Sequence, residues 1–102
     1  MKTILNYSPN FETKKRKYKQ IKFLIFHYTG MKNESTAISR LTNIKSKVSS
    51  HYLIKNNGEI ITFVPDLYIA WHAGISFWKN FELLNKNSIG IEISNPGHNF
   101  KY

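Results

Sequence analysis

The chain has 102 residues and a formal net charge of +9 at pH 7, from 15 Lys and Arg residues against 6 Asp and Glu residues. This length limits it to one domain, and its content of 41% hydrophobic and 15% aromatic residues excludes a disordered chain. No apolar run approaches the ~20 residues of a membrane-spanning helix. Because cysteine is absent, disulfides and thiolate ligands are excluded, so nitrogen and oxygen atoms must hold any metal.

The positive charge is concentrated at the N-terminus, where residues 1–22 hold seven basic residues and one acid, Glu12. We predict that residues 1–20 form a basic surface arm. The Lys-Lys-Arg-Lys run in this segment is one pattern of a nucleic-acid binder. Lys outnumbers Arg throughout the chain and clusters of base-reading Arg are absent, so we favour a solvated arm and no nucleic-acid partner. Without an apolar stretch of signal-peptide length, a cytoplasmic product is expected.

The first predicted element of the fold is a strand over residues 21–27, a continuous run of β-branched and aromatic residues that suits a strand covered on both faces. Tyr28-Thr-Gly30 then predicts a turn. A helix of about ten residues is expected next, because Ser35 is a favourable N-cap and the following apolar residues recur at helical spacing.

A β-hairpin is predicted from residues 49–54 and 59–64, which flank Asn56-Asn-Gly58. Asn-Gly between two apolar runs is the strongest short-range signal for a hairpin, because both residues tolerate the positive φ angles of its turn. This hairpin is the most secure local prediction in the chain.

The remaining sequence predicts a long connection and a final strand. Residues 65–87 are typical of a connection with one short helix at most, and they carry Trp71-His-Ala-Gly74. Residues 88–93 alternate strictly between Ile and other residues, as a strand does. Strand, helix, hairpin, connection and strand together predict an α/β fold with a mixed central β-sheet flanked by helices.

Two polar residues in predicted strands are candidates for chemistry. His27 ends a buried apolar strand, and Glu92 lies inside another. A lone strand histidine is more often a hydrogen-bonded structural residue, but a buried carboxylate is costly unless it is paired or near a metal. If the two strands are neighbours, the side chains can face one cavity and serve as a metal ligand and a general base in hydrolysis.

The other three histidines give weaker signals. His51 begins a hairpin strand and His72 lies in the Trp-His-Ala-Gly segment, so either lines the same cleft or packs at its edge. His98 has no periodic context and is expected in a loop. The spacing of the four histidines matches no compact zinc motif, so no complete metal site follows from spacing.

Six motifs in order, covering residues 21–98, give the chain a resemblance to the zinc-dependent N-acetylmuramoyl-L-alanine amidases of the AmpD/AmiD branch, which are related to peptidoglycan recognition proteins and phage lysozyme-type amidases. Each motif is weak alone, but the set is specific. The motifs are Phe26-His27-Tyr-Thr-Gly30, Val48-Ser-Ser-His-Tyr-Leu-Ile54, Asn57-Gly-Glu-Ile60, Phe63-Val64, Ala70-Trp-His-Ala-Gly74, and Asn87-Ser-Ile-Gly-Ile-Glu-Ile93 followed by Asn95-Pro-Gly-His98.

The resemblance implies roles for particular residues. His27 matches the family's first zinc ligand, and Glu92 matches the carboxylate that activates the metal-bound water. The implied substrate is a peptidoglycan fragment, cleaved at the amide between the lactyl group of N-acetylmuramic acid and L-alanine. The remaining residues at matching positions are implied to border or support the substrate groove: Trp71, His72, Asn95 and His51.

One departure from the family pattern changes the expectation for this chain. The family takes a second zinc histidine and an Asp or Cys ligand from a region well beyond the strand that holds the Glu, whereas this sequence stops at Tyr102. We therefore expect residues 21–102 to be the N-terminal portion of a single amidase-like domain, truncated or split, with an incomplete Zn²⁺ site and impaired activity. The absent part is expected to leave one sheet face uncovered and open to association.

Two alternatives to an amidase remain open. The first is a non-catalytic remnant that binds muramyl-peptides, which explains the Trp-His-Ala-Gly segment without further ligands but gives no reason for Glu92. The second is a small basic nucleic-acid binder that uses residues 14–22, for which the salt dependence of binding is the test.

Overall fold

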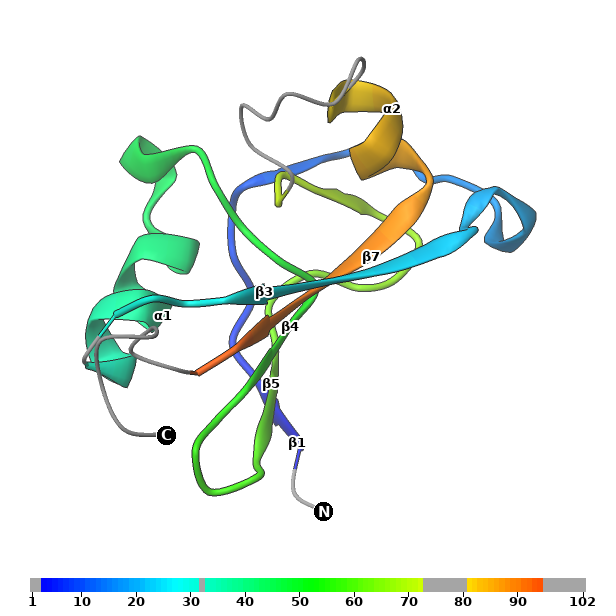
Figure 1. Cartoon of the computed structure of the whole chain (residues 1–102). Coiled ribbons are helices and arrows are strands. Elements are labelled where there is room, and N and C mark those ends of the chain that lie inside the picture. The colour runs from blue at the N-terminus through cyan, green and yellow to red at the C-terminus, as the bar shows by residue number, and fades with distance from the viewer. Residues whose placement is uncertain (1–2, 32, 73–80, 95–102) are drawn as a thin grey trace.

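The computed structural model describes residues 3–31, 33–72 and 81–94. A five-stranded sheet in the order β1-β5-β4-β7-β3 forms its centre, as Figure 1 shows. All neighbouring strands run parallel except the β4–β5 pair, so the prediction of a mixed sheet in an α/β fold is confirmed. The strands are β1 (Thr3–Leu5), β3 (Phe23–Tyr28), β4 (Tyr52–Ile54), β5 (Ile60–Thr62) and β7 (Ser88–Ile93).

The predicted hairpin is present as β4 and β5, paired antiparallel with Leu53 opposite Ile61. Gly58 has a φ of 87°, a left-handed conformation that a side chain would strain. The Asn57 side chain accepts a hydrogen bond from the Glu59 N–H at 2.9 Å and supports the same turn. The Asn-Gly signal therefore located this hairpin, although only Gly58, and not Asn57, adopts the positive φ that was expected of both residues.

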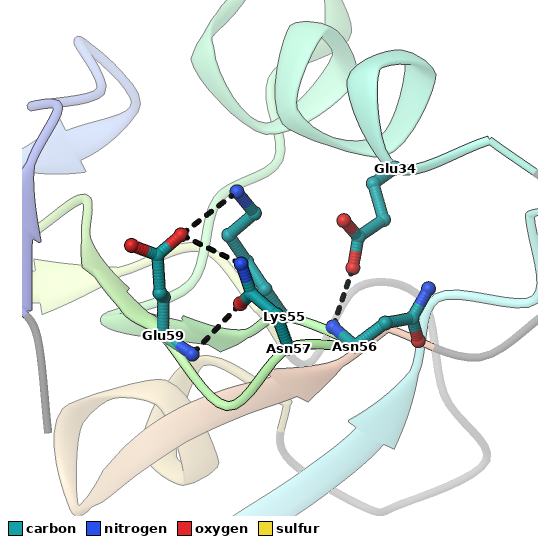
Figure 2. A network of polar contacts seen from close by, with 5 residues as sticks. All are labelled: Glu34, Lys55, Asn56, Asn57 and Glu59. Atoms are coloured by element: carbon teal, nitrogen blue, oxygen red, sulfur yellow. Dashed lines mark hydrogen bonds and ion pairs between the residues drawn. The ribbon is translucent and has the colours of Figure 1, made fainter.

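Helix α1 (Glu34–Thr42) begins earlier than the sequence pattern predicted. Asn33, rather than Ser35, is the N-cap, because its side-chain oxygen accepts a hydrogen bond from the Ser35 N–H at 2.9 Å. The Glu34 carboxylate in turn accepts a hydrogen bond from the Asn56 N–H at 2.7 Å. Figure 2 shows how this contact ties the start of α1 to the hairpin turn.

The shorter elements complete the fold around the sheet. A second, two-stranded sheet pairs β2 with β6 antiparallel. The short helix expected between residues 65 and 87 is α2. These elements are β2 (Phe11–Glu12), η1 (Tyr18–Gln20), η2 (Ile44–Ser46), β6 (Ile69–Ala70) and α2 (Phe81–Lys86). None of the helices in the described part of the chain is long and apolar enough to cross a membrane.

The N-terminal segment differs from the surface arm expected for residues 1–20. Strand β1 extends the central sheet through its pairing with β5. Farther along, the Ser8 hydroxyl donates to the Leu41 carbonyl at 2.6 Å, Asn10 is fully buried, and Arg16 is only 5% exposed. The segment was misjudged because its polar side chains satisfy distant backbone groups in the interior, which composition does not reveal.

The two faces of the central sheet are unlike. One face packs against the main core, in which Leu53 and Phe63 are fully buried. The other face presents Leu24, Phe26 and Tyr28 with 60%, 57% and 68% of their surfaces exposed. The expected apolar exposure is therefore present, and association through this face stays a prediction.

Candidate functional site

His27 and Glu92 lie directly opposite each other on β3 and β7, which pair in parallel. Register partners in neighbouring strands point to the same side of a sheet, so the two side chains share one face. The prediction that they lie on adjacent strands is confirmed. Both occupy the face that packs against the core, where Leu53 is also opposite Glu92 from β4.

His72 joins this pair from the segment before the undescribed residues. Its ring centroid lies 5.7 Å from that of His27. The Ser88 hydroxyl donates to the Leu84 carbonyl at 2.6 Å, so the same oxygen accepts from His72 Nε2–H at 2.9 Å. This assignment places the proton of His72 on Nε2 and leaves Nδ1 as an acceptor.

Gly90 makes room for the His72 ring on strand β7. A Cβ added to Gly90 would lie 2.7 Å from His72 Nδ1, well inside contact distance. A glycine inside a strand often marks such a close approach. The glycine on the non-Ile face of this strand therefore has a packing reason.

Three buried polar atoms in this cluster have no hydrogen-bond partner: His27 Nε2, His72 Nδ1 and Glu92 Oε2. Buried polar groups are normally hydrogen-bonded, so each exception calls for an explanation. Their concentration on one sheet face, between adjacent strands, indicates a place prepared for a ligand that supplies the missing contacts.

Burial sets the charge state of the cluster. It raises the pKa of Glu92 to about 7, against a smaller opposing effect of the Arg40 charge. The pKa of His72 falls to about 3, first through burial and then through the neighbouring His51, His27 and Arg16 charges. Burial also lowers the pKa of His27, so the site at neutral pH combines neutral imidazoles with a carboxyl group near its midpoint of ionisation.

His51 lies in the interior, fully buried, and not in a cleft. Its Nδ1 accepts a hydrogen bond from the Gly90 N–H at 3.1 Å, so Nε2 carries the proton and donates to the Tyr68 carbonyl at 2.8 Å. Burial, with a smaller contribution from the Arg16 charge, lowers the pKa of His51 to about 4. Both ring nitrogens of His51 are used in hydrogen bonds to the backbone, which suits the expected role in support of the groove, and that role stays a prediction.

A cavity of about 160 Å³ opens beside the cluster, between α1 and the sheet. Glu92 and His72 lie in its wall, whereas His27, which was expected to face one cavity with Glu92, is not among the lining residues. The full lining is Thr29, Met31, Ala37, Arg40, Leu41, Val48, Ser49, His72 and Glu92.

Two predicted groove residues stand apart from this cavity. Trp71 is half-buried, and its backbone N–H donates to the Ser49 hydroxyl at 3.0 Å, so it borders the segment that leads into the cavity without lining it. Asn95, together with His98, lies outside the described residues. Trp71 and Asn95 therefore keep their groove roles as predictions.

The described residues do not form a complete metal centre. Within residues 3–31, 33–72 and 81–94, no group of three His, Cys, Asp or Glu side chains could hold a metal ion. His27 Nε2, buried and without a partner, has the chemistry of one nitrogen ligand. A catalytic zinc site commonly needs three protein ligands, so the described part of the chain fits only a fraction of such a site.

Three contributors to the cluster escaped the sequence analysis. Ser88 fixes the tautomer of His72, yet it looked like an ordinary first strand residue. Arg16 contacts His51 with 3.2 Å between Nη2 and Nε2, but it was hidden among exposed lysines. Gly90 did carry a signal, since a glycine that interrupts an apolar strand indicates close approach.

The profile of the N-acetylmuramoyl-L-alanine amidases matches residues 17–102. N-acetylmuramoyl-L-alanine amidase AmiD of Escherichia coli (strain K12) is 44% identical over 87 residues, which cover 78% of this chain and 30% of AmiD. The 1,6-anhydro-N-acetylmuramyl-L-alanine amidase AmpD of Citrobacter freundii is 49% identical over 47 residues, 46% of this chain and 25% of AmpD. The chain thus spans less than a third of either relative.

A solved structure supports the same comparison. The complex of AmiD from Escherichia coli with the substrate anhydro-N-acetylmuramic acid-L-Ala-D-γ-Glu-L-Lys superposes with a TM-score of 0.63 and 40% sequence identity. The superposition covers 84% of this chain and 35% of the AmiD chain.

Proposed function

This chain belongs to the N-acetylmuramoyl-L-alanine amidase family, and we propose on that premise that it acts on peptidoglycan fragments. The proposed reaction is hydrolysis of the amide between the lactyl group of N-acetylmuramic acid and L-alanine. One observation supports it above the others. Glu92 lies opposite His27 in the β3–β7 register, and each presents a buried polar atom without a partner.

Glu92 is the proposed general base and acid. As a carboxylate it takes a proton from the water that adds to the lactyl carbonyl carbon. As a carboxylic acid it returns that proton to the L-alanine nitrogen when the carbon–nitrogen bond breaks. A pKa of about 7 suits both transfers, because an acid–base catalyst works best with a pKa near the working pH.

His27 is the proposed first zinc ligand, through Nε2. When bound, zinc would polarise the scissile carbonyl and acidify water. The described residues supply only part of the ligand set, so we expect little hydrolysis from the 102-residue chain alone.

The second candidate function is binding of muramyl-peptides without cleavage. The incomplete ligand set among the described residues favours it. Under this alternative, the cavity and the unpartnered atoms of His72 and Glu92 serve recognition, and the high pKa of Glu92 lets it donate a hydrogen bond to the ligand.

The test is to incubate the full chain with anhydro-N-acetylmuramic acid-L-Ala-D-γ-Glu-L-Lys, with and without added zinc. Mass spectrometry detects released peptide, and NMR titration detects binding. Zinc-dependent cleavage, even at the low rate expected of this chain, that Glu92→Gln abolishes supports the amidase, whereas binding with no detectable cleavage in any condition supports the alternative. Absence of both binding and cleavage would overturn the two functions together.

A further inference from the structure

The cavity beside Glu92 has a base and a rim of different character. His72 at its base is only 8% exposed, whereas Arg40, from helix α1, is exposed at its rim. The lining also includes the apolar side chains of Ala37, Leu41 and Val48. A ligand in this cavity can therefore meet apolar side chains as well as the carboxyl group of Glu92 and the guanidinium of Arg40.

Arg40 also borders a second hollow, on the outer side of α1. This hollow is wide, polar and rich in hydroxyl groups, and its lining is Ser35, Thr36, Ser39, Arg40, Asn43, Lys45 and Ser46. Arg40 is the residue shared by the linings of these two hollows. It therefore lies where a bound chain would leave the cavity and continue over the helix.

The acidic residue of α1 is engaged elsewhere. Glu34 accepts the Asn56 N–H at 2.7 Å and faces the hairpin, as the close view in Figure 2 shows. The carboxyl group whose charge interacts with that of Arg40 belongs to Glu92, which also lines the cavity. A ligand carboxylate at the rim would thus meet a guanidinium with no acid from its own helix beside it.

We infer that Arg40 binds the free α-carboxylate of the γ-linked glutamate in the peptide stem of a muropeptide, one residue beyond L-alanine. This inference rests on the proposed function. In the ligand of the AmiD complex, L-Ala is followed by D-γ-Glu, and a γ-linkage leaves the α-carboxylate free. Arg40 is a specificity residue and takes no part in the proton transfers.

The groups of the ligand have suitable partners among the residues that line the cavity. With the scissile amide at Glu92 and His27, the alanine methyl group meets the apolar side chains. The glutamate carboxylate follows about 7 Å farther along an extended chain, on the side of Arg40. The planar guanidinium can accept a carboxylate through two parallel hydrogen bonds.

A comparison of two ligands tests the contact between Arg40 and the glutamate carboxylate. One is N-acetylmuramic acid-L-Ala-D-γ-Glu-L-Lys, and the other carries an amide in place of the free α-carboxylate, which changes charge while it keeps shape. Because Arg40 is exposed, the chain is expected to bind the carboxylate ligand only about fivefold more tightly at low salt. This preference should shrink as salt is added.

The variants are Arg40→Gln and the matched control Lys47→Gln, which removes the same charge from a nearby exposed residue that lines neither hollow. Arg40→Gln should bind both ligands alike, with the affinity of the original chain for the amide ligand. Lys47→Gln should keep the fivefold preference. NMR titration gives all six dissociation constants, and one-dimensional spectra confirm that each variant is folded.

The outcomes distinguish this inference from the proposed function. If the original chain binds both ligands equally, or if Arg40→Gln keeps the preference, the assignment of Arg40 is overturned while muropeptide binding stands. If the original chain binds neither ligand, the proposed function itself fails, and the role of Arg40 fails with it.

Discussion

Two buried pairs of a histidine and a charged residue contact the same glycine, Gly90. His51 accepts the Gly90 N–H and contacts Arg16, whereas the His72 ring covers the Cα of Gly90 and lies with Glu92 in the cavity wall. The first pair is fully used in hydrogen bonds to the backbone. In the second pair, His72 Nδ1 and Glu92 Oε2 have no partner.

This difference in hydrogen bonding distinguishes charged residues that are buried to stabilise the fold from those that are buried at a ligand site. Arg16 donates to the carbonyls of Asp66, Asn85 and Lys86 at 2.8–3.1 Å, so its side chain holds three segments of the chain together. Glu92 has no such use in the fold and retains a pKa near neutrality. Evolution tolerates an unsatisfied buried group when a ligand completes it, so the comparison predicts opposite effects of mutation in the two pairs.

The largest effect is expected from Arg16→Met. It keeps much of the apolar volume but leaves the carbonyls of Asp66, Asn85 and Lys86 buried without their donor, so the free energy of unfolding should fall by about 4 kcal/mol. Urea unfolding followed by circular dichroism measures this change. Lys15→Met, at the exposed neighbouring residue, should change it by less than about 0.5 kcal/mol. Equal stability of the two variants would show that the Arg16 contacts are not structural.

Gly90→Ala is the next largest change, because it acts on the residue that both pairs share. Its methyl group would overlap the His72 ring, so the ring must move at a cost of about 2 kcal/mol. The imidazole NMR signals of His72 should shift more than those of His51, which contacts only the Gly90 backbone. Unchanged His72 signals would contradict the close packing seen here.

Glu92→Gln should change how the free energy of unfolding depends on pH. The carboxyl pKa rises from 4.5 to about 7 on folding, so the folded state favours the protonated form. Its contribution to stability is complete below about pH 4.5 and is lost as the pH rises through 7, by about 2 kcal/mol after allowance for partial exposure.

The measurement is urea unfolding of the original chain and of Glu92→Gln between pH 4.5 and 8. The histidines titrate in both proteins, so the difference between the two profiles isolates Glu92. The variant should become the more stable protein at pH 8 and should gain nothing at pH 4.5. If the unfolding free energies of the two proteins changed with pH in the same way, the pKa of Glu92 would not be raised by folding.

The smallest effect on stability is expected on the opposite face of the sheet. Phe26 is 57% exposed there, so Phe26→Thr should change the free energy of unfolding by less than about 0.5 kcal/mol. It should nevertheless reduce self-association, because it removes apolar surface from the exposed face. Light scattering over a concentration series measures this, and a concentration-independent mass for the original chain would refute association through this face.

Local sequence patterns predicted the elements that local chemistry controls. Asn-Gly located the hairpin turn, in which Gly58 adopts a positive φ, and Ile alternation located β7. The N-cap was misplaced from Asn33 to Ser35, because both residues are good caps and only the geometry of the first turn distinguishes them. Residues 1–20 were misjudged for a similar reason. Their polar composition is evident in the sequence, but the burial of their side chains depends on carbonyl groups far away in the sequence.

The candidate site was predicted in part. His27 and Glu92 were identified as exceptions to apolar strands, and the structure places them side by side. The fates of His51 and His72 were not distinguishable from spacing, since both lie in similar short motifs. His51 is saturated by backbone groups and His72 keeps an open Nδ1, a difference that depends on Ser88 and Gly90 far away in the sequence.

By itself, the sequence determined the class of fold, the hairpin, the two site strands and the family, because these depend on short patterns of residue type and on motif order. Only the tertiary structure decided which polar residues have all their hydrogen bonds within the fold and which keep polar atoms available to a ligand. Arg16 meets its partners 35 to 70 residues away, and Arg40 gains its position at the cavity rim only when α1 packs near Glu92. Such contacts arise only when distant segments pack together. The role of a charged side chain then depends on its burial and on its hydrogen-bond partners, and not on its residue type.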